Sequence, residues 1–344
     1  MKAVQYRTIG APPEVVEIDT PAPGPGQVLL KVTAAGLCHS DEFMMSLPED
    51  QYVYGLPLTL GHGGAGVVEA LGEGTTGIDV GASVLVYGPW GCGACRACAV
   101  GAENYCVNAA ALGIVPPGLG APGAMAEYMI VDSPRHLVPI GDMDPVKAVP
   151  LTDAGLTPYH AVKRALPKLG AGTTAVVIGV GGLGHLGVQM IKQLSGAAVI
   201  ALDIAQDKLD LARSLGADHV LTSDASAAEA IRELTGGTGA DVVIDFVGAQ
   251  PTVELAMTSV AIDGQVTIVG VGPGVAGVGF FTMPFGVDVG TTYWGSRREL
   301  MEVVSMAERG QLDIHTETFS LDDAPRAYER MHEGSLLGRA VVVP

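Results

Sequence analysis

Residues 174–203 read TAVVIGVGGLGHLGVQMIKQLSGAAVIALD, and this stretch decides the fold. Two runs rich in Val and Ile, at 175–178 and 199–202, enclose a segment whose apolar residues recur at helical spacing. A strand, a helix and a second strand in this order predict a parallel strand pair with a crossover helix. The chain is therefore predicted to be an α/β protein with a doubly wound parallel sheet. Further strand-like runs follow at 219–222, 242–246 and 266–270.

A glycine-rich turn joins the first strand to the helix. It contains Gly179, Gly181, Gly182, Leu183 and Gly184 in the pattern G-x-G-x-x-G. The glycines permit a tight turn and let the backbone approach a pyrophosphate, whose charge then lies at the helix N-terminus. The pattern predicts a Rossmann dinucleotide-binding domain. The alternative is a glycine-rich turn without a ligand.

Asp203 ends the next strand, 19 residues after Gly184. A carboxylate there can accept hydrogen bonds from an adenosine ribose and would repel a 2'-phosphate, so it favours NAD over NADP. A helix-capping Asp remains the alternative. Lys208 either reaches the ribose or is solvated. The other residues predicted to line the cofactor are Val247, Val269 and Val271.

The two ends of the chain differ in character from its middle. Residues 1–152 show short alternating strands, such as QVLLKV and VVEAL, separated by Gly/Pro turns. The last segment has two helical patterns, at 297–310 and 322–334, and a final strand, RAVVVP. A chain of 344 residues favours two domains. We expect 1–152 and 293–344 to form one β-rich domain and 153–292 the nucleotide-binding domain, with a cleft near Asp153 and Tyr293.

Composition limits the class of protein. Hydrophobic residues make up 48% and charged residues 16%, and the net charge is -18. Such an acidic chain would be repelled by nucleic acid and by anionic membrane surfaces. The longest uncharged stretch, 170–191, is interrupted by seven glycines and His185 and does not resemble a membrane span. The first residues lack the features of a signal peptide, so we expect a cytoplasmic protein.

Four of the five cysteines lie within fifteen residues: Cys92, Cys95, Cys98 and Cys106. In a cytosolic chain this spacing favours a metal over disulfides, and four thiolates suit a closed tetrahedral zinc site. An iron–sulfur cluster is the alternative, but the last spacing is too long and Val107 stands where proline is typical. We predict a structural zinc lobe at about residues 88–110.

The fifth cysteine, Cys38, lies in GLCHSD, and His62 lies in LTLGHGG. Each follows a strand-like segment and is flanked by glycine. Either residue alone is more typical of a core than of a site. Asp153, at the expected cleft, is the candidate for a third ligand.

Together these segments resemble the zinc-containing medium-chain alcohol dehydrogenase family, and within it the bacterial NAD-dependent secondary alcohol dehydrogenases. The resemblance covers the whole chain and includes GLCHSD, residues 61–66, the four-cysteine lobe, DAGLTPYH, GVGGLG with Asp203, and GRAVVV. It implies a GroES-like catalytic domain and two zinc ions per chain, one structural and one catalytic.

The resemblance also implies roles for single residues. Cys38, His62 and Asp153 would bind the catalytic zinc and leave one position open for water or substrate oxygen. Ser40 would pass on the alcohol proton. His39 would lie near the cofactor phosphates and Arg339 would pair with the pyrophosphate.

The implied reaction is reversible oxidation of primary or secondary alcohols, secondary preferred, with hydride transfer to NAD. The substrate would be a small hydrophobic or aryl-alkyl alcohol or ketone. One alternative is a polyol dehydrogenase of the same family, and another is a catalytically silent NAD-binding protein. Each residue of the implied substrate wall could equally fill core: Phe43, Tyr54, Trp90, Leu119, Tyr293 and Trp294.

Two positions depart from the family pattern. Phe43 stands where many relatives continue the proton relay with histidine, and Gly63 stands where the family usually has glutamate after the zinc-binding histidine. Without that carboxylate we expect a more electrophilic metal with less assisted ligand exchange. The alternative is that Glu69 compensates or that the change is neutral.

The apolar segment VGFFTMPFG, residues 278–286, is predicted to be a strand. An exposed apolar strand favours pairing between subunits edge to edge. We therefore expect a homodimer or a homotetramer.

Overall fold

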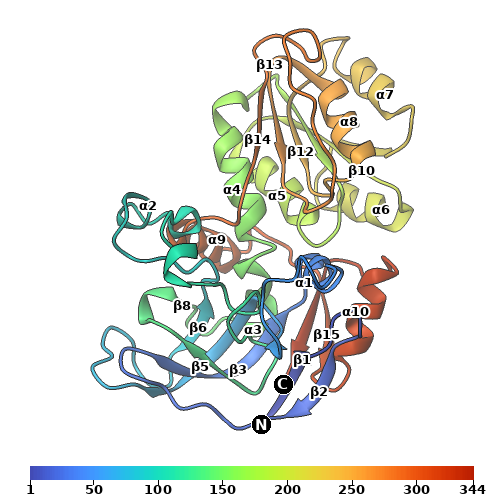
Figure 1. Ribbon diagram of the computed structural model, residues 1–344. Coiled ribbons are helices and arrows are strands. Elements are labelled where there is room, and N and C mark those ends of the chain that lie inside the picture. The colour runs from blue at the N-terminus through green and yellow to red at the C-terminus, as the bar shows by residue number, and fades with distance from the viewer. The chain divides into compact units, whose positions relative to one another are not determined.

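The computed structural model describes residues 1–344, which form two compact units. Unit 1 comprises Met1–Leu156, Gly295–Arg309 and Ile314–Pro344, and unit 2 comprises Thr157–Trp294 and Gly310–Asp313. Unit 1 is rich in antiparallel strands and unit 2 contains a parallel sheet (Figure 1). The predicted α/β class with an additional β-rich domain is confirmed.

Unit 2 is built on a six-stranded sheet in which every neighbouring pair is parallel. The strand order is β11-β10-β9-β12-β13-β14, so the chain crosses back over the sheet after β11 and places β12 on the other side of β9. The strands are β9 (Thr174–Ile178), β10 (Ala198–Asp203), β11 (His219–Thr222), β12 (Ala240–Asp245), β13 (Val260–Ile268) and β14 (Asp288–Thr291). The five predicted strands correspond to β9–β13.

Helices flank this sheet because their apolar residues are spaced to form one buried stripe. In the first crossover helix, α5, Leu186, Met190 and Ile191 are fully buried, as their helical spacing in the sequence predicts. The helices of this part of the chain are α4 (Leu156–Ala165), η5 (Leu166–Lys168), α5 (Gly184–Leu194), α6 (Gln206–Ser214), α7 (Ala227–Leu234) and α8 (Gln250–Ser259).

The prediction of a strand at 278–286 was wrong. These residues form turns and irregular backbone, and the edge strand β14 begins only at Asp288. Pro284 lacks a backbone N–H for a ladder, and Gly286 adopts a φ of +76°. The apolar side chains are nevertheless exposed: Phe281 is 91% exposed and Phe280 73%.

Unit 1 contains a seven-stranded sheet in the order β15-β16-β3-β5-β6-β8, with β7 also pairing with β3, and a three-stranded sheet in the order β2-β1-β4. Its strands are β1 (Lys2–Tyr6), β2 (Glu14–Glu17), β3 (Val28–Gly36), β4 (Leu58–Thr59), β5 (Gly63–Leu71), β6 (Ser83–Val86), β7 (Tyr128–Val131), β8 (Leu137–Pro139), β15 (Thr316–Ser320) and β16 (Arg339–Val343).

Short helices connect these strands, and two longer ones come from the C-terminal segment. The predicted patterns at 297–310 and 322–334 form α9 (Arg297–Glu308) and α10 (Ala324–His332). A capping box between Ser296 and Glu299 starts α9. The others are α1 (His39–Met45), α2 (Arg96–Ala99), η1 (Glu103–Tyr105), η2 (Ala110–Leu112), η3 (Pro134–His136), α3 (Pro145–Ala148) and η4 (Val149–Thr152).

One edge of the larger sheet brings distant segments together. Gly36, the last residue of β3, pairs antiparallel with Gly63 of β5 and with Val341 of β16. Because neighbours run in opposite directions, the end of β3 lies beside the starts of β5 and β16. Residues just after β3, just before β5 and at the start of β16 therefore meet at this edge.

No helix of the structure combines the length and the apolar character that crossing a membrane requires.

Candidate metal centres and cofactor turn

The predicted ligands Cys38, His62 and Asp153 meet at the sheet edge just described. Cys38 is the N-cap of α1 and follows β3 by two residues, and His62 immediately precedes β5. Asp153 caps the C-terminal end of η4. The fold of unit 1 therefore brings together three residues that are far apart in sequence.

The three side chains are buried and their ligand atoms converge. Cys38, His62 and Asp153 are 6%, 1% and 7% exposed, and their ligand atoms all lie within 4.8 Å of one another. His62 Nε2 lies 3.5 Å from Asp153 Oδ2. One sulfur, one nitrogen and one oxygen ligand form a set that suits zinc with an open fourth position. Ser40 Oγ lies 3.5 Å from Cys38 Sγ, at the border of this cluster.

A carboxylate that the sequence reasoning missed supports this cluster from behind. Asp41 is fully buried, and its Oδ1 lies 2.8 Å from His62 Nδ1. The pairing places a proton on Nδ1 and leaves Nε2 to face Cys38 and Asp153, which is how outer carboxylates orient a metal-binding histidine. The available signal was the spacing in GLCHSD, which puts an acid three residues after Cys38.

Arg339 binds the third candidate ligand. Its guanidinium is buried and donates to Asp153 Oδ2. Burial alone would raise the pKa of Asp153, but the positive charge of Arg339 holds it well below its usual range. Asp153 therefore stays ionised, as a metal ligand must. The implied contact of Arg339 with a pyrophosphate stays a prediction.

Buried charges at the cluster balance in pairs. Zinc with ionised Cys38 and Asp153 sums to zero, and the negative Asp41 and positive Arg339 that support the ligands also sum to zero. A buried net charge is costly, so this balance suits a dry site.

Gly63 leaves little room behind the cluster. A Cβ at this position would lie 2.7 Å from Thr152 Oγ1. Glu69 does not compensate for the absent carboxylate, because its side chain is exposed six residues further along β5, about 20 Å away.

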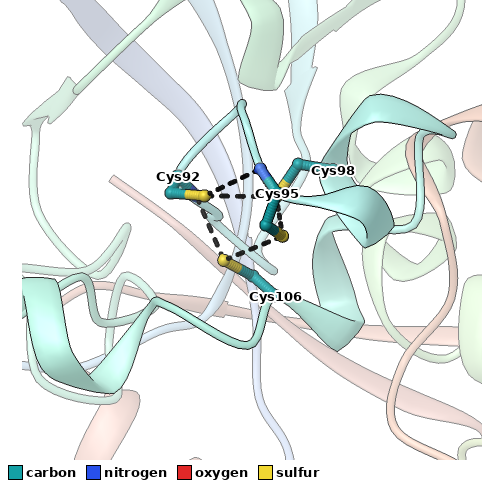
Figure 2. Close-up of side chains that lie close together, drawn as sticks. All are labelled: Cys92, Cys95, Cys98 and Cys106. Carbon is teal, nitrogen blue, oxygen red and sulfur yellow. Dashed lines mark hydrogen bonds between the residues drawn. The ribbon is translucent and has the colours of Figure 1, made fainter.

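The four remaining cysteines form the second cluster (Figure 2). Their sulfur atoms lie within 4.8 Å of one another, at 3.5 Å for Cys95–Cys98 and 3.9 Å for both Cys92–Cys98 and Cys95–Cys106. A tetrahedral zinc with Zn–S bonds of about 2.3 Å requires sulfur separations of about 3.8 Å. Backbone N–H groups of Ala94 and Cys95 lower the pKa of Cys92 to about 6. The lobe therefore fits a structural zinc.

A buried ionic network ties this lobe to the sheet. His136, fully buried just before β8, lies 2.5 Å from Asp132 through Nδ1 and 3.0 Å from Glu103 through Nε2. Glu103 Oε2 also accepts the backbone N–H of Gly91, next to the first cysteine, at 3.0 Å. Trp90, a predicted substrate contact, stacks on the His136 ring at 5.5 Å.

The predicted cofactor turn lies between β9 and α5. Gly179 has a φ of +86°, and a Cβ at Gly184 would lie 1.8 Å from the Gly179 carbonyl oxygen, so both positions require glycine. Asp203, at the end of β10, accepts the backbone N–H of Val180 at 2.8 Å and that of Ala205 at 3.1 Å. Its carboxylate retains lone pairs for a further donor.

The other predicted residues divide between the units. In unit 2, Val247 follows β12, and Val269 and Val271 follow β13, so all three lie at the same end of the sheet as the glycine turn. Lys208 lies on α6. His39 is exposed at the start of α1 in unit 1. Of the predicted substrate wall, Phe43, Tyr54, Trp90 and Leu119 belong to unit 1, whereas Tyr293 and Trp294 belong to unit 2, where their rings are 5.3 Å apart.

Unit 2 has the parallel sheet of a dinucleotide-binding domain, and unit 1 has a Cys–His–Asp cluster that suits a metal. Together these features define the class of metal-dependent dehydrogenases. Residues 24–142 match the alcohol dehydrogenase GroES-like domain and residues 182–309 match the zinc-binding dehydrogenase family. The chain belongs to the zinc-containing medium-chain alcohol dehydrogenases, which are NAD(P)-dependent oxidoreductases.

Individual relatives match along the entire chain. An NAD-dependent alcohol dehydrogenase of Sulfurisphaera tokodaii is 35% identical, with all of both chains covered. D-arabinose 1-dehydrogenase (NADP⁺) of Saccharolobus solfataricus is 33% identical, with 100% of this chain and 97% of the relative covered. The crystal structure of the alcohol dehydrogenase from Aeropyrum pernix superposes with a TM-score of 0.92 at 34% identity, with all of both chains covered.

Proposed function

We propose that this enzyme oxidises small hydrophobic secondary alcohols, including aryl-alkyl alcohols, to ketones with NAD, and that it also accepts primary alcohols and catalyses the reverse reactions. The observation that carries the proposal is the buried convergence of Cys38, His62 and Asp153, whose three ligand atoms lie within 4.8 Å of one another. We propose that unit 1 is the catalytic domain and unit 2 the NAD-binding domain.

The two clusters support a proposal of two metal sites per chain. Cys38, His62 and Asp153 would hold the catalytic zinc, and the four-cysteine lobe would hold the structural one. Zinc in the three-ligand site supplies Lewis acidity toward the alcohol oxygen. The protein's own groups orient this site: Asp41 directs His62, and Arg339 holds one oxygen of Asp153.

Ser40 would take the alcohol proton; its hydroxyl, 3.5 Å from Cys38 Sγ at the start of α1, supports this role. Phe43, one turn further along α1, has no group that could continue a relay, so Ser40 would pass the proton to water or to a hydroxyl of the bound cofactor.

Asp203 supports NAD over NADP. The carboxylate lies at the end of β10, beside the glycine turn, and would repel a 2'-phosphate while accepting from a ribose hydroxyl. His39, Lys208, Val247, Val269 and Val271 would contribute further cofactor contacts.

The proposed substrate class rests on the aromatic and apolar set described above, which contains no charged residue. D-arabinose oxidation is the second candidate, because a relative with that activity in its name is 33% identical along the chain. A sugar would require a pocket with more hydrogen-bonding groups.

A metal count combined with kinetics tests the function. We expect two zinc ions per chain, with one lost in His62→Ala and the other in Cys106→Ser. We also expect kcat/KM to be at least tenfold higher with 1-phenylethanol and NAD than with D-arabinose or with NADP. A higher kcat/KM for D-arabinose would favour the sugar, and unchanged zinc content in His62→Ala would refute the catalytic metal site.

A further inference from the structure

Asp41 receives hydrogen bonds from three different segments of unit 1. Its Oδ1 binds His62 Nδ1 at 2.8 Å, and its Oδ2 accepts the Cys38 backbone N–H at 3.2 Å. The third donor is the hydroxyl of Tyr328, on α10, at 3.1 Å from Oδ2. Cys38 and His62 belong to the candidate zinc site, whereas Tyr328 lies about 290 positions from Asp41 in sequence and has no place in that site.

A buried carboxylate is stable only when its oxygens are hydrogen-bonded, and each missing donor frees it to turn. Asp41 is fully buried, and Oδ2 has two donors. Without the phenol, Oδ2 would retain only the Cys38 N–H, a longer bond at 3.2 Å. The orientation of Oδ1 toward His62 therefore depends on what holds Oδ2.

The position of Tyr328 is itself well determined. Ala324, Ala327, Tyr328 and Met331 form the buried stripe of α10, and Tyr328 is 6% exposed. Burial and the nearby charge of Asp41 raise the pKa of Tyr328 well above 10. The phenol therefore remains a neutral donor throughout the working range of an enzyme.

We propose that Tyr328 is a positioning residue for the catalytic zinc site: its hydroxyl fixes the Asp41 carboxylate, which fixes the His62 imidazole with Nε2 directed at the metal. This inference rests on the proposed function only in placing zinc at Cys38, His62 and Asp153. The C-terminal helix thus takes part in metal retention through a chain of two hydrogen bonds.

Tyr6 offers a matched control within the same core. It is fully buried and belongs to the same apolar cluster as Tyr328. Its hydroxyl donates to the Met45 carbonyl at 3.0 Å and accepts the Gly10 N–H at 2.7 Å, so its hydrogen-bond partners include neither a candidate zinc ligand nor Asp41. Tyr6→Phe therefore removes a buried hydroxyl that makes no hydrogen bond to the groups that orient His62.

The experiment measures zinc release from the purified holoenzyme to a chromogenic chelator, with melting temperature recorded in parallel. Zinc release from the wild type should show two kinetic phases, one for each site. The phase that is absent in His62→Ala is the one from the catalytic site. Tyr328→Phe should accelerate that phase about tenfold, as expected for a group that supports a metal ligand, and leave the lobe phase unchanged. Tyr6→Phe should alter the melting temperature but neither phase.

A double-mutant cycle tests whether the effect passes through Asp41. In an Asp41→Asn background, Tyr328→Phe should produce no further acceleration. Equal catalytic-phase rates in wild type, Tyr328→Phe and Tyr6→Phe would overturn the positioning role alone. If His62→Ala removed neither phase, the zinc assignment would be wrong and the positioning role would fail with it.

Discussion

Gly63 shows how a single residue changes the surroundings of a metal site. The resemblance led us to expect a glutamate there; in the structure the Thr152 hydroxyl lies 2.7 Å from where a Cβ would be. Thr152 is itself held by a hydrogen bond to the Val149 carbonyl at 2.8 Å. The supporting charges come instead from Asp41 and Arg339, each bound to a ligand side chain.

Restoring the carboxylate tests this arrangement. Gly63→Ala measures the steric cost alone, which we expect to be about 1–3 kcal/mol because Thr152 must move. Relative to Gly63→Ala, Gly63→Glu should release the catalytic zinc faster and shift the midpoint of the pH–rate profile upward by on the order of one unit, because a further negative charge makes the metal less electrophilic. Identical zinc retention and pH profiles in the two variants would contradict the expectation.

At the scale of elements, the cysteine lobe depends on a network outside its four ligands. His136 lies between Glu103 and Asp132, and Arg135 adds a second cation 3.4 Å from Glu103. Arg135 also donates to the Gly91 carbonyl, while Glu103 accepts the Gly91 N–H. The start of the lobe is thus held at both the N–H and the carbonyl of a single residue, Gly91.

The network predicts a defined pH dependence of stability. Burial would lower the pKa of His136, but its hydrogen bonds to Asp132 and Glu103 raise that pKa above 6.5. The contribution of His136 to the free energy of unfolding is therefore complete below pH 6.5 and is lost as the pH rises through the folded-state pKa. Burial would raise the pKa of Glu103, but the hydrogen bond to His136 lowers that pKa below 4.5. The contribution of Glu103 to the free energy of unfolding is therefore complete above pH 4.5 and is lost as the pH falls through the folded-state pKa.

The stability advantage of the wild type over His136→Gln should therefore be greatest between about pH 4.5 and 6.5 and should shrink at higher pH. We expect a maximum of about 3 kcal/mol, since the change leaves Asp132 without its cation and Glu103 with Arg135 alone. Denaturant unfolding at a series of pH values measures this difference in the free energy of unfolding. The control is His219→Gln, at an exposed histidine of unit 2, against which the wild type should show no such advantage. A difference independent of pH would show that His136 contributes packing only.

At the scale of the whole molecule, the loop before β14 is the feature that indicates self-association. Phe280, Phe281 and Phe285 are 73%, 91% and 59% exposed, and β14 is an edge strand of the parallel sheet. Exposed aromatic clusters beside an unpaired strand edge favour association with another chain. We infer that a second copy of the chain covers this region, giving the dimer or tetramer expected from the sequence.

Light scattering after size exclusion tests this inference. The wild type should have a mass of at least twice 35.1 kDa, and Phe281→Asp should shift it toward the monomer because a buried charge at the interface is unfavourable. Val80→Asp, at a 60% exposed apolar residue of unit 1, should leave the mass unchanged. A monomeric wild type would contradict the inference.

The α/β class, five of the six parallel strands, the glycine turn and the four-cysteine lobe could all be predicted from the amino-acid sequence. All of these are local: strand runs, helical spacing, turn glycines and closely spaced ligands depend on neighbours along the chain. The candidate catalytic ligands could be joined into one site only by resemblance, because Cys38, His62 and Asp153 are far apart in sequence.

The tertiary structure alone decided which groups support those ligands. Asp41, Arg339 and Tyr328 meet the cluster because β3, β5 and β16 pair at one edge and α10 packs a buried stripe nearby. It also showed that 278–286 is a loop, because proline and glycine override an apolar pattern that reads as a strand. Long-range strand pairing, which no local pattern encodes, created the support behind the metal.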